Sequence, residues 1–489
     1  MIVTDAAPES TFVRPNQQST AYTERRRQHW EARESGPSRW AAFRRYYHAR
    51  LAQIYKLSVP PGMRILELGC GEGDLLAAME PGFGVGIDLS SPRIERAKKK
   101  YPGLNFQTGD AAEMELDGDF DFILCSDLLN DLWDVQTVLE KVAAHCHSGT
   151  RILINSYSYL WAGPRRVAEL MGLVQPQLTQ NWLTVEDIEN LLRLASFEVI
   201  RKSPEIMCPV RIPLVDAFCN RYLTRLPFFR LFGITNFIVA RPIPRVKPQA
   251  LPIVTVVVPA RNEAGNIPAI LDRVPEMGAG TELIFVEGNS SDSTWERIQQ
   301  EIAARPGCKA QLYKQTGKGK GDAVRLGFEK ASGDLLMILD ADLTVPPEDL
   351  PRFYDAWYSN KGDFINGVRL IYPMEDKAMR FFNLLGNKFF SLAFSWLLSQ
   401  SVKDTLCGTK VLSKAHYQTI AANRGYFGEI DPFGDFDLLF GAARYNLKIV
   451  GLPVRYRERK YGETNIQRWR HGAILLRMVL LASRRIRFV

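Results

Sequence analysis

The pattern of apolar and polar positions along the chain predicts an α/β architecture that occurs twice. Short apolar runs rich in Val, Ile and Leu recur through both halves, and segments with apolar residues at helical spacing lie between them. Such runs are typical of strands buried on both faces of a parallel sheet, and their alternation with helices is typical of a doubly wound sheet. We therefore expect two doubly wound α/β domains in succession.

The first predicted domain covers residues 39–241 and follows a polar, charge-rich segment, residues 1–38, that we expect to be a flexible arm. Thr184 in front of a helical apolar pattern predicts a capped helix. An aromatic and basic stretch over residues 209–241 favours a lid together with part of the core. The other expected elements are a helix over 39–57, strands over 64–68, 83–87, 120–125 and 151–156, and a helix over 135–145.

Polar residues gather where the early strands of this domain end. Gly69-Cys70-Gly71-Glu72-Gly73-Asp74 follows the first strand, and Asp88 ends the second strand about 20 residues later. Gly109-Asp110-Ala111 and Ser126-Asp127 stand further along the chain. A glycine loop between a strand and a helix presents backbone N–H groups to a ligand, and a carboxylate after the second strand suits ribose hydroxyls. These positions predict a nucleoside-containing ligand.

The set ELGCGEGD, GIDLS and GDA resembles the class I methyltransferases that use S-adenosylmethionine, over residues 39–241 and most strongly up to Asp127. The resemblance implies a Rossmann-like fold and a cofactor whose sulfonium is already a leaving group, so the protein need only align an acceptor. The cofactor-binding residues that it implies are Glu67, Gly69, Gly71 and Gly73 at the methionine part, Asp88 at the ribose, Asp110 at the adenine amino group, and Asp127. The general base stays open between Tyr157, Tyr159, Asp127, Asp131 and His48, each of which a structural role also explains.

A proline-rich linker over residues 242–251 predicts a domain boundary, and the second domain extends over residues 252–489. Apolar runs predict strands over 254–258 and 282–286. The loop Lys318-Gly319-Lys320-Gly321 sets lysines among glycines, which suits a diphosphate, and a solvated turn is the alternative.

An apolar run over residues 334–342 ends in two carboxylates one residue apart, Asp340 and Asp342. Alternation along a strand places both on the same side at its carboxyl end, where open α/β sheets bind ligands. Carboxylate oxygens are hard ligands that suit Mg²⁺ or Mn²⁺ together with a diphosphate. The alternative is one exposed Asp and one capping Asp, and the surrounding motifs favour the metal site.

The blocks VVVPARNEAGNI, VEGNSSDST, GKGKGDAVRLGF and LDADLTVPPEDL occur in order, followed by DTLCGTKVL, GDFDLLFGA and PVRYRERKYGET. They resemble the family-two glycosyltransferases with the GT-A fold, and among these the polyprenyl-phosphate sugar transferases. One block has Glu287-Gly288 where the family usually has two acids, so the nucleotide base stays open. The resemblance implies a nucleotide-sugar site at Pro259, Asn262, Glu263, Glu287, Lys320 and Asp340, metal ligands Asp340 and Asp342, and catalytic roles for Asp342, Asp435, Asp437 and Arg459.

In the implied reaction the anomeric carbon of the sugar is inverted. A bound cation neutralises the leaving diphosphate, and a carboxylate such as Asp435 takes the proton of a hydroxyl acceptor. If the acceptor is a phosphate, no base is required and Arg459 positions the anionic group. Asp435 and Asp437 would face the acceptor, and helix capping is the alternative role for Asp435.

Composition narrows the cellular setting. Of 489 residues, 46% are hydrophobic and 24% are charged, the net charge is +8, and no run reaches the ~18 apolar residues of a membrane span. The seven Cys form no CxxC pair and residues 1–20 contain no apolar signal core, so we expect a cytoplasmic protein. The basic residues are dispersed rather than gathered in one stripe, which argues against nucleic acid as a partner.

Two segments favour contact with an anionic membrane surface, at the inner face of the membrane beside a lipid-linked acceptor. Residues 381–402 are strongly apolar although Asn383, Asn387 and Lys388 interrupt them, and residues 469–489 form a basic amphipathic pattern. The alternative is a core helix and a helix packed on the sheet.

Together these features predict a bifunctional transferase, an S-adenosylmethionine-dependent methyltransferase fused to a metal-dependent glycosyltransferase. Its partners would be a nucleotide-sugar donor and a glycan or polyprenyl-phosphate-type acceptor within one glycan or glycolipid pathway. One alternative keeps the glycosyltransferase and makes the first domain a ligand sensor or scaffold. Another is a membrane-docked interaction protein that is inactive at both sites.

Overall fold

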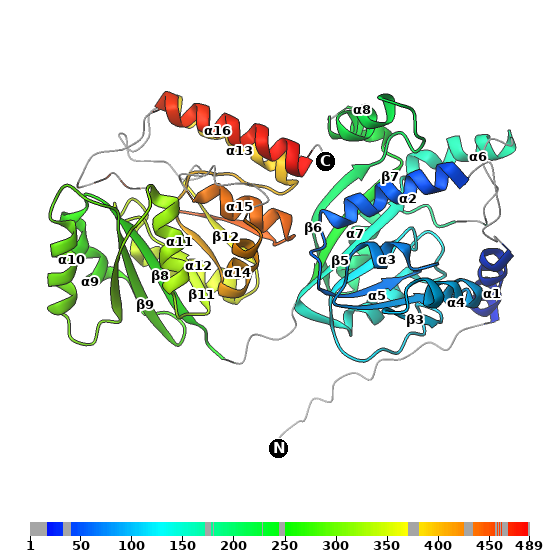
Figure 1. Cartoon of the computed structure of the whole chain (residues 1–489), viewed down its shortest axis with the longest axis horizontal. Helices are drawn as coiled ribbons and strands as arrows, with labels where there is room; N and C mark the ends of the chain where they lie inside the picture. Colours follow the sequence, from blue (N-terminus) through cyan, green and yellow to red (C-terminus); the bar gives the residue numbers. More distant parts are fainter. Residues whose placement is uncertain are drawn as a thin grey trace, which may run out of the picture.

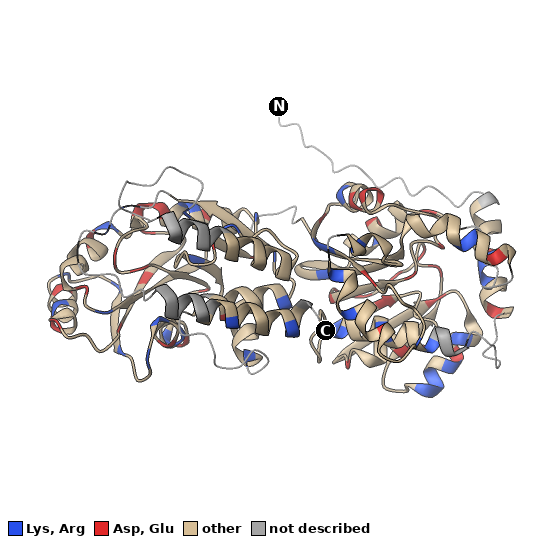
Figure 2. Ribbon diagram, turned by 90° about the horizontal axis from the view of Figure 1, so that it is seen from above, with Lys and Arg blue, Asp and Glu red and all other residues tan. Residues whose placement is uncertain are grey.

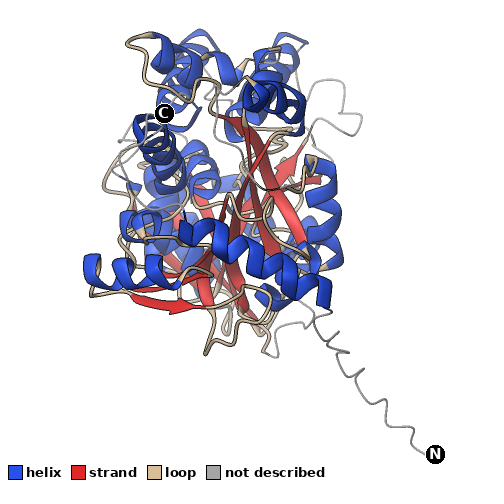
Figure 3. Cartoon of the chain, turned by 90° about the vertical axis from the view of Figure 1, so that its right-hand side faces the viewer, coloured by secondary structure: helices blue, strands red, loops and turns tan. Residues whose placement is uncertain are grey.

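The computed structural model describes residues 17–32, 41–171, 178, 180–226, 228–243, 250–369, 381–424, 434–454, 457, 459, 461 and 468–487. Within these residues the strands form two seven-stranded sheets, one in each half of the chain (Figure 1). Helices flank the first sheet on both sides (Figure 3). The predicted linker, residues 242–251, falls between the two sheets, but residues 244–249 lie outside the described part of the chain.

The first sheet has the strand order β3-β2-β1-β4-β5-β7-β6. The strands from β1 to β5 run parallel, as predicted, whereas β7 is antiparallel to both β5 and β6. The strands are β1 (Arg64–Leu68), β2 (Phe83–Asp88), β3 (Asn105–Thr108), β4 (Phe120–Ser126), β5 (Cys146–Tyr157), β6 (Phe197–Glu205) and β7 (Thr235–Pro242).

The helices of the first half connect these strands and cover the sheet. Thr184 caps α7 as predicted, with a capping box in which Thr184 and Asp187 exchange hydrogen bonds. The helices are α1 (Gln17–Ala32), α2 (Ala41–Lys56), α3 (Asp74–Ala78), α4 (Ser91–Lys100), α5 (Val135–Ala143), α6 (Ala162–Leu170), α7 (Val185–Leu194) and α8 (Val215–Arg221), with the 3₁₀ turns η1 (Tyr159–Trp161), η2 (Leu223–Arg225) and η3 (Phe229–Phe232).

The second sheet has the order β10-β9-β8-β11-β13-β12-β14, and β13 is antiparallel to both of its neighbours. The apolar run that was predicted to reach Asp342 forms a shorter strand, because β11 ends at Ile338. The strands are β8 (Ile253–Ala260), β9 (Gly280–Glu287), β10 (Ala310–Lys314), β11 (Leu335–Ile338), β12 (Phe364–Val368), β13 (Lys410–Ser413) and β14 (Ile449–Pro453).

The second half contains longer helices toward its carboxyl end. Helices α13 and α16 pack against each other above the sheet (Figure 1). The helices are α9 (Ile267–Arg273), α10 (Thr294–Ala303), α11 (Lys320–Lys330), α12 (Leu350–Tyr358), α13 (Phe381–Leu398), α14 (Lys414–Ala422), α15 (Asp435–Arg444) and α16 (Arg468–Ala482), with 3₁₀ turns η4 (Ala264–Asn266) and η5 (Pro347–Asp349) and a π-helical turn η7 (Ser483–Arg487).

Each sheet is buried on both faces, as the apolar runs predicted. Leu66 of β1 packs into one hydrophobic cluster and its neighbour Ile65 into the cluster on the other face. Leu336 and Leu335 of β11 divide in the same way. Successive strand residues point to opposite faces, so a continuous apolar run is what a sheet covered on both sides requires.

One expectation about the first half was wrong. Part of the predicted flexible arm, residues 17–32, is helix α1, held by the buried Arg26 side chain, which pairs with Asp131 at 2.8 Å. The aromatic stretch over residues 209–241 is divided, because Phe218 and Phe228 are 55% and 67% exposed whereas Phe237 of β7 is buried. Residues 1–16 and 33–40 of the predicted arm lie outside the described residues.

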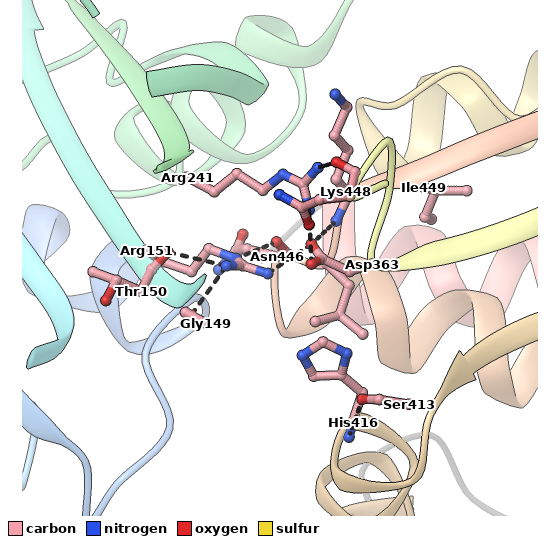
Figure 4. A network of polar contacts seen from close by, with 12 residues as sticks. Gly149, Thr150, Arg151, Arg241, Asp363, Ser413, His416, Asn446, Lys448 and Ile449 are labelled. Atoms are coloured by element: carbon pink, nitrogen blue, oxygen red, sulfur yellow. Dashed lines mark hydrogen bonds and ion pairs between the residues drawn. The ribbon is translucent and has the colours of Figure 1, made fainter. Parts of the chain in front are cut away.

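A buried polar network joins the two halves of the chain (Figure 4). Arg151 of β5 and Arg241 of β7 each pair with Asp363, which precedes β12, at 2.7 and 2.8 Å. Arg151 also donates from Nε to the Asn446 carbonyl at 2.8 Å. Lys448 pairs with Glu198 beside them. Asp363 thus pairs with two arginines of the first sheet, and Glu198 is a second carboxylate partner of Arg241.

Candidate active sites

The glycine loop after β1 has the backbone geometry that only glycine adopts easily. Gly69, Gly71 and Gly73 have φ values of 73°, 55° and 78°. A Cβ on Gly73 would lie 2.5 Å from Cζ of Phe106, so no larger residue fits there. Since α3 after the loop is only five residues long, the loop N–H groups rather than a helix dipole provide the polar surface.

Asp88 and Asp110 lie at the carboxyl-terminal edge of the first sheet, where the predicted cofactor site is. Asp88 accepts from the Gly71 and Ser90 backbone N–H groups, both at 2.9 Å, so it ties the glycine loop to the end of β2. Asp110 accepts from the Ala112 N–H at 2.9 Å and from the Thr23 hydroxyl at 3.2 Å. The structure therefore brings the loop and Asp88 into direct contact, as the spacing predicted.

Glu67 is a buried carboxylate at the same edge. Burial raises the pKa of Glu67 well above its usual value, and the nearby Asp88 adds to this effect. Its Oε2 atom has no hydrogen-bond partner among the described residues. A buried acceptor left without a partner is costly, so a ligand with N–H or O–H groups fits this position. This orphaned oxygen, together with the glycine loop, makes the donor and acceptor set compatible with S-adenosylmethionine.

Asp127 lies at the end of β4 in a hydrogen-bonded cluster. Its Oδ1 accepts from Asn155 Nδ2 at 2.6 Å and from Tyr47 Oη at 3.0 Å, and its backbone has a φ of 52°. Burial raises the pKa of Asp127 to about 7, although these two hydrogen bonds act in the opposite direction. A non-glycine residue at this φ and a carboxyl group that titrates near neutrality are both features of functional sites.

The other candidate bases of the first domain have different surroundings. Asp131 is held in the ion pair with Arg26, and Tyr159 and His48 are exposed. Tyr157 is stacked on Tyr47, with ring centroids 6.3 Å apart, and burial raises its pKa. Asp127 is thus the candidate whose pKa suits a general base.

Helix α1 supplies residues to this site that the sequence reading missed. Thr23 and Arg26 contact Asp110 and Asp131, and Arg93 of α4 lies over the Trp30 ring at 4.8 Å. The apolar pattern of the sequence did not reveal α1, because this helix has no continuous apolar stripe; it is held by polar and cation–π contacts and by the contact between the Tyr22 and Trp133 rings, whose centroids are 5.2 Å apart.

In the second half, Asp340 follows β11 and pairs with Lys320, the first residue of α11, at 2.5 Å. Burial opposes ionisation, but Lys320 outweighs it and lowers the pKa of Asp340. Gly408 closes this group, because a Cβ there would overlap the Asp340 carboxylate and the Lys320 amine. Gly408 lies in the DTLCGTKVL block, and its presence in that motif is the sequence feature that could have identified it as a site residue.

Asp342 faces a different cation. Its Oδ2 accepts from Arg459 Nη2 at 2.6 Å, and its Oδ1 from the Thr344 hydroxyl at 2.7 Å. Arg459 also contacts Glu263 at 3.5 Å, and Glu263 accepts from Asn266. Burial raises the pKa of Glu263 to about 7 even though Arg459 lowers it. Arg459 therefore bridges a proposed metal ligand and a proposed donor-site residue, which sequence distance could not reveal.

The remaining residues predicted for the donor site lie near the carboxyl ends of β8 and β9 and on the loop after β8. Pro259 is in β8, opposite Val286 of β9. Asn262 has a φ of 57° and accepts from the Ser291 N–H at 2.8 Å. Glu287 is buried and accepts from the Ser290 N–H at 2.5 Å. The two loops are therefore bonded to each other at the edge of the sheet.

The acceptor-site candidates lie on α15. Asp435 is its first residue, and its side chain lies outside the described residues. Gly434 before it approaches Gly321 so closely that a Cβ would lie 2.5 Å from the Gly321 Cα, which places the start of α15 beside the Lys320 loop. Asp437 pairs with Arg424 at 2.6 Å and is 8% exposed, so the structure gives it a partner in the protein.

The residues present fit a divalent cation bound jointly with a diphosphate. No group of three or more His, Cys, Asp or Glu side chains that could hold a metal occurs in the described part of the chain. Asp340 and Asp342 supply hard oxygens on one loop, and the remaining ligands would come from phosphate oxygens and water, as is usual for Mg²⁺.

Comparison with known proteins agrees with this division of the chain. Residues 60–198 match the family model of a methyltransferase domain, and residues 255–414 match that of glycosyl transferase family 2. The chain therefore joins a methyltransferase domain to a family 2 glycosyltransferase domain.

The second domain is related to polyprenyl-phosphate sugar transferases. It is 28% identical over 221 residues to the dolichol-phosphate mannosyltransferase of Pyrococcus furiosus, a match that covers 44% of this chain and 59% of that protein. It is 26% identical over 222 residues to the undecaprenyl-phosphate 4-deoxy-4-formamido-L-arabinose transferase of Edwardsiella ictaluri, covering 44% of this chain and 63% of that protein. The chain thus spans about three-fifths of the length of these relatives.

Solved structures similar to the first half include magnesium protoporphyrin IX methyltransferase from Synechocystis PCC 6803 with bound SAH, at 15% identity and a TM-score of 0.33, covering 45% of this chain and 99% of that one. Another is an S-adenosylmethionine-dependent methyltransferase from Mesorhizobium loti, at 18% identity and a TM-score of 0.32, covering 40% and 97%.

Proposed function

We propose that this protein is a bifunctional transferase. The second domain would transfer a sugar from a nucleotide-sugar to a polyprenyl-phosphate or glycan acceptor with a divalent cation, and the first would transfer a methyl group from S-adenosylmethionine. The observation that carries the proposal is the pairing of two adjacent carboxylates, Asp340 and Asp342, with two separate cations, Lys320 and Arg459. When bound, the divalent metal ion would neutralise negative charge on the leaving diphosphate.

Each side chain of the second site has a distinct proposed role. Lys320 and Arg459 are positively charged hydrogen-bond donors. Once a divalent metal ion takes their place beside Asp340 and Asp342, they would bind phosphate oxygens of the diphosphate. The buried Glu263 and Glu287, on loops bonded to each other, would position the nucleoside of the donor. Asp435 would accept the proton of a hydroxyl acceptor, a step that a phosphate acceptor does not need. Asp437, paired with Arg424, would keep the start of α15 in place.

In the first domain, we assign cofactor binding to the glycine loop, Glu67, Asp88 and Asp110, and proton transfer to Asp127. A carboxyl group with a pKa near 7 is about half ionised at neutral pH, and its ionised form is basic enough to take a proton from an acceptor. The sulfonium of the cofactor supplies the leaving group, so alignment of the acceptor is the remaining requirement.

Surface composition supports peripheral contact with an anionic membrane. Among the described residues, no helix is long and apolar enough to cross a bilayer. Helices α8, α13 and α16 lie on the same side of the molecule (Figure 1). Large apolar side chains in these helices or directly before them are exposed, among them Leu214, Leu392 and Leu480. Helix α16 contains Arg477, and Arg484 and Arg485 follow it in η7, so basic positions gather toward the carboxyl end of the chain (Figure 2). Apolar and basic side chains on one face suit an anionic lipid surface.

The decisive experiment screens sugar nucleotides against the full chain with Mn²⁺, polyprenyl phosphate and S-adenosylmethionine. Transfer of a sugar that requires Mn²⁺ and of a methyl group from the cofactor is the expected result. If S-adenosylmethionine binds but no methyl group is transferred, the first domain is a sensor rather than a catalyst. If no sugar nucleotide is consumed, the proposed function is wrong.

A further inference from the structure

A cavity of about 40 Å³ lies between the two domains. The first domain lines it from α2, β6, η2 and β7, and the second from the ends of α13 and α15 and from η7. One water occupies ~10–15 Å³ by the same kind of measure, so the cavity has room for a small polyatomic group. It is separate from both candidate active sites, because none of their proposed residues line it.

Positive charge dominates the wall of this cavity. Its described lining includes four arginines, Arg201, Arg225, Arg444 and Arg485, and a single carboxylate, Glu205. Arg225 pairs with Glu205 at 2.5 Å, and the two side chains are 6% and 5% exposed. Glu205 carries one negative charge beside Arg225 and the nearby Arg201, so an anion in the cavity would offset the remaining positive charge of these two guanidinium groups. Burial lowers the pKa of Arg201, and the nearby Arg225 acts in the same direction.

Several buried polar atoms at this cavity have no hydrogen-bond partner among the described residues. They are Nε of Arg201, Nε of Arg225 and Oε2 of Glu205. The two Nε atoms are donors, whereas the carboxylate oxygen is an acceptor. A ligand that satisfies all three must accept hydrogen bonds and also donate one. Inorganic phosphate as HPO₄²⁻ keeps one O–H and does both, as does a phosphate monoester in its singly charged form, while sulfate only accepts near neutral pH.

We propose that the interdomain cavity is a binding site for a phosphate group, either free phosphate or the head group of a phosphorylated lipid. The arginines of both domains bind its oxygens, and Glu205 accepts from its O–H. The apolar side chains of Leu397 in α13 and Ile486 in η7 also line the cavity, and in the proposed complex they would contact the first carbons of an acyl or prenyl chain. Such a ligand contacts both domains and therefore stabilises their association.

The test uses the full chain carrying Asp342→Asn, in EDTA, so that the proposed metal site does not contribute to the measured phosphate binding. The result for the cavity is therefore independent of whether the proposed function is correct. Calorimetry with inorganic phosphate is expected to show one site, and sulfate is expected to bind more weakly. Arg485→Gln should weaken phosphate binding roughly tenfold or more, since a hydrogen bond to a charged group contributes about 1.5–3 kcal/mol. Arg484→Gln is the matched control, because Arg484 is the adjacent exposed arginine and does not line the cavity.

Arg201→Gln is a second variant, from the opposite domain. The Arg201 side chain donates to Ser58, and the substitution leaves both members of the Arg225–Glu205 pair in place. The absence of phosphate binding, or equal binding by both cavity variants and the control, overturns the proposal. A short prenyl monophosphate distinguishes the sources of the phosphate. Tighter binding than inorganic phosphate identifies a lipid head group, and equal or weaker binding identifies free phosphate.

Discussion

Arg241 donates from Nη1 to Oδ1 of Asp363 at 2.8 Å, although the two residues belong to different domains and the Arg241 side chain is fully buried. Asp363 also holds Arg151, so one carboxylate is the counter-ion of two buried arginines. Burial opposes ionisation of Asp363, but Arg151 and Arg241 lower its pKa overall. The junction between the domains therefore contains buried ion pairs.

Asp363→Ala should lower the free energy of unfolding by about 3–5 kcal/mol, because it leaves the buried Arg151 without its carboxylate partner and Arg241 with Glu198 alone. Urea denaturation followed by tryptophan fluorescence measures this. Asp272→Ala, which removes an exposed ion pair with Arg305, is the control and should change stability by about 0–1 kcal/mol. Equal effects of the two changes would show that the junction adds no special stability.

The lowered pKa of Asp363 also sets a direction for pH. A carboxyl group with a depressed folded-state pKa stabilises the protein above its unfolded value, 3.8, and this contribution is lost as the pH falls through the folded-state value. Acid should thus loosen the domain junction in the wild type. In Asp363→Ala the acid-dependent loss should be smaller over the same pH range.

Asp88→Ala should weaken the binding of S-adenosylhomocysteine roughly tenfold to a hundredfold, because Asp88 holds the Gly71 loop and is the proposed ribose ligand. Calorimetry measures the affinity. Glu95→Gln removes an exposed carboxylate of α4 that pairs only locally with Lys98 and should leave binding unchanged. Unaltered affinity in Asp88→Ala would remove Asp88 from the cofactor site.

Asp127→Asn should flatten the pH dependence of stability between pH 3.8 and about 7. The folded-state pKa of Asp127 is raised, so its stabilising contribution is complete below pH 3.8 and is lost as the pH rises through about 7. Asparagine does not titrate, so the variant lacks this slope. Denaturation at several pH values tests the expectation, and the methyl-transfer rate of the variant should be low at every pH.

Asp342→Asn should reduce Mn²⁺-dependent sugar transfer by about a hundredfold or more, since it weakens both the cation site and the anchor of Arg459. Consumption of the sugar nucleotide gives the rate. Asp355→Asn, on the exposed side of α12, serves as the control with wild-type activity. A fully active Asp342→Asn enzyme would contradict the proposed metal role.

Leu392→Glu should reduce flotation with anionic liposomes at low salt, because it places a charge at the 73% exposed position of α13 that we assign to the membrane face. Leu194→Glu, at an exposed position of α7, is the control. A wild-type protein that does not float would favour a soluble acceptor.

The sequence predicted the parallel strands well for a physical reason. Strands such as β1 and β4 are continuous apolar runs, and burial on both faces requires that pattern. It did not predict the antiparallel direction of β7 or β13, since an apolar run has no directional signal. Helix α1 was missed because it is held by polar contacts rather than by an apolar stripe.

Within the candidate sites, the sequence motifs assigned Asp88 and the glycine loop to one site, and Lys320 and Asp340 to another. The structure shows a direct contact within each pair. It could not predict that Arg459 would face Asp342 across 117 residues of sequence, or that Asp437 would pair with Arg424. Such contacts depend on the tertiary arrangement. Arg151 and Arg241 did carry a signal that went unused, because a charged residue inside a buried strand needs a partner.

The shared counter-ion of β5, β7 and β12 has a practical consequence for anyone who dissects this protein. A protease that cut the proline-rich linker, residues 242–251, would break the covalent connection between the domains. The ion pairs of Asp363 with Arg151 and Arg241 would remain. The two fragments should then co-elute on gel filtration and separate only in denaturant. In separately expressed domains, in contrast, Arg151 of the first domain and Asp363 of the second would each lose the partner that they have in the full chain.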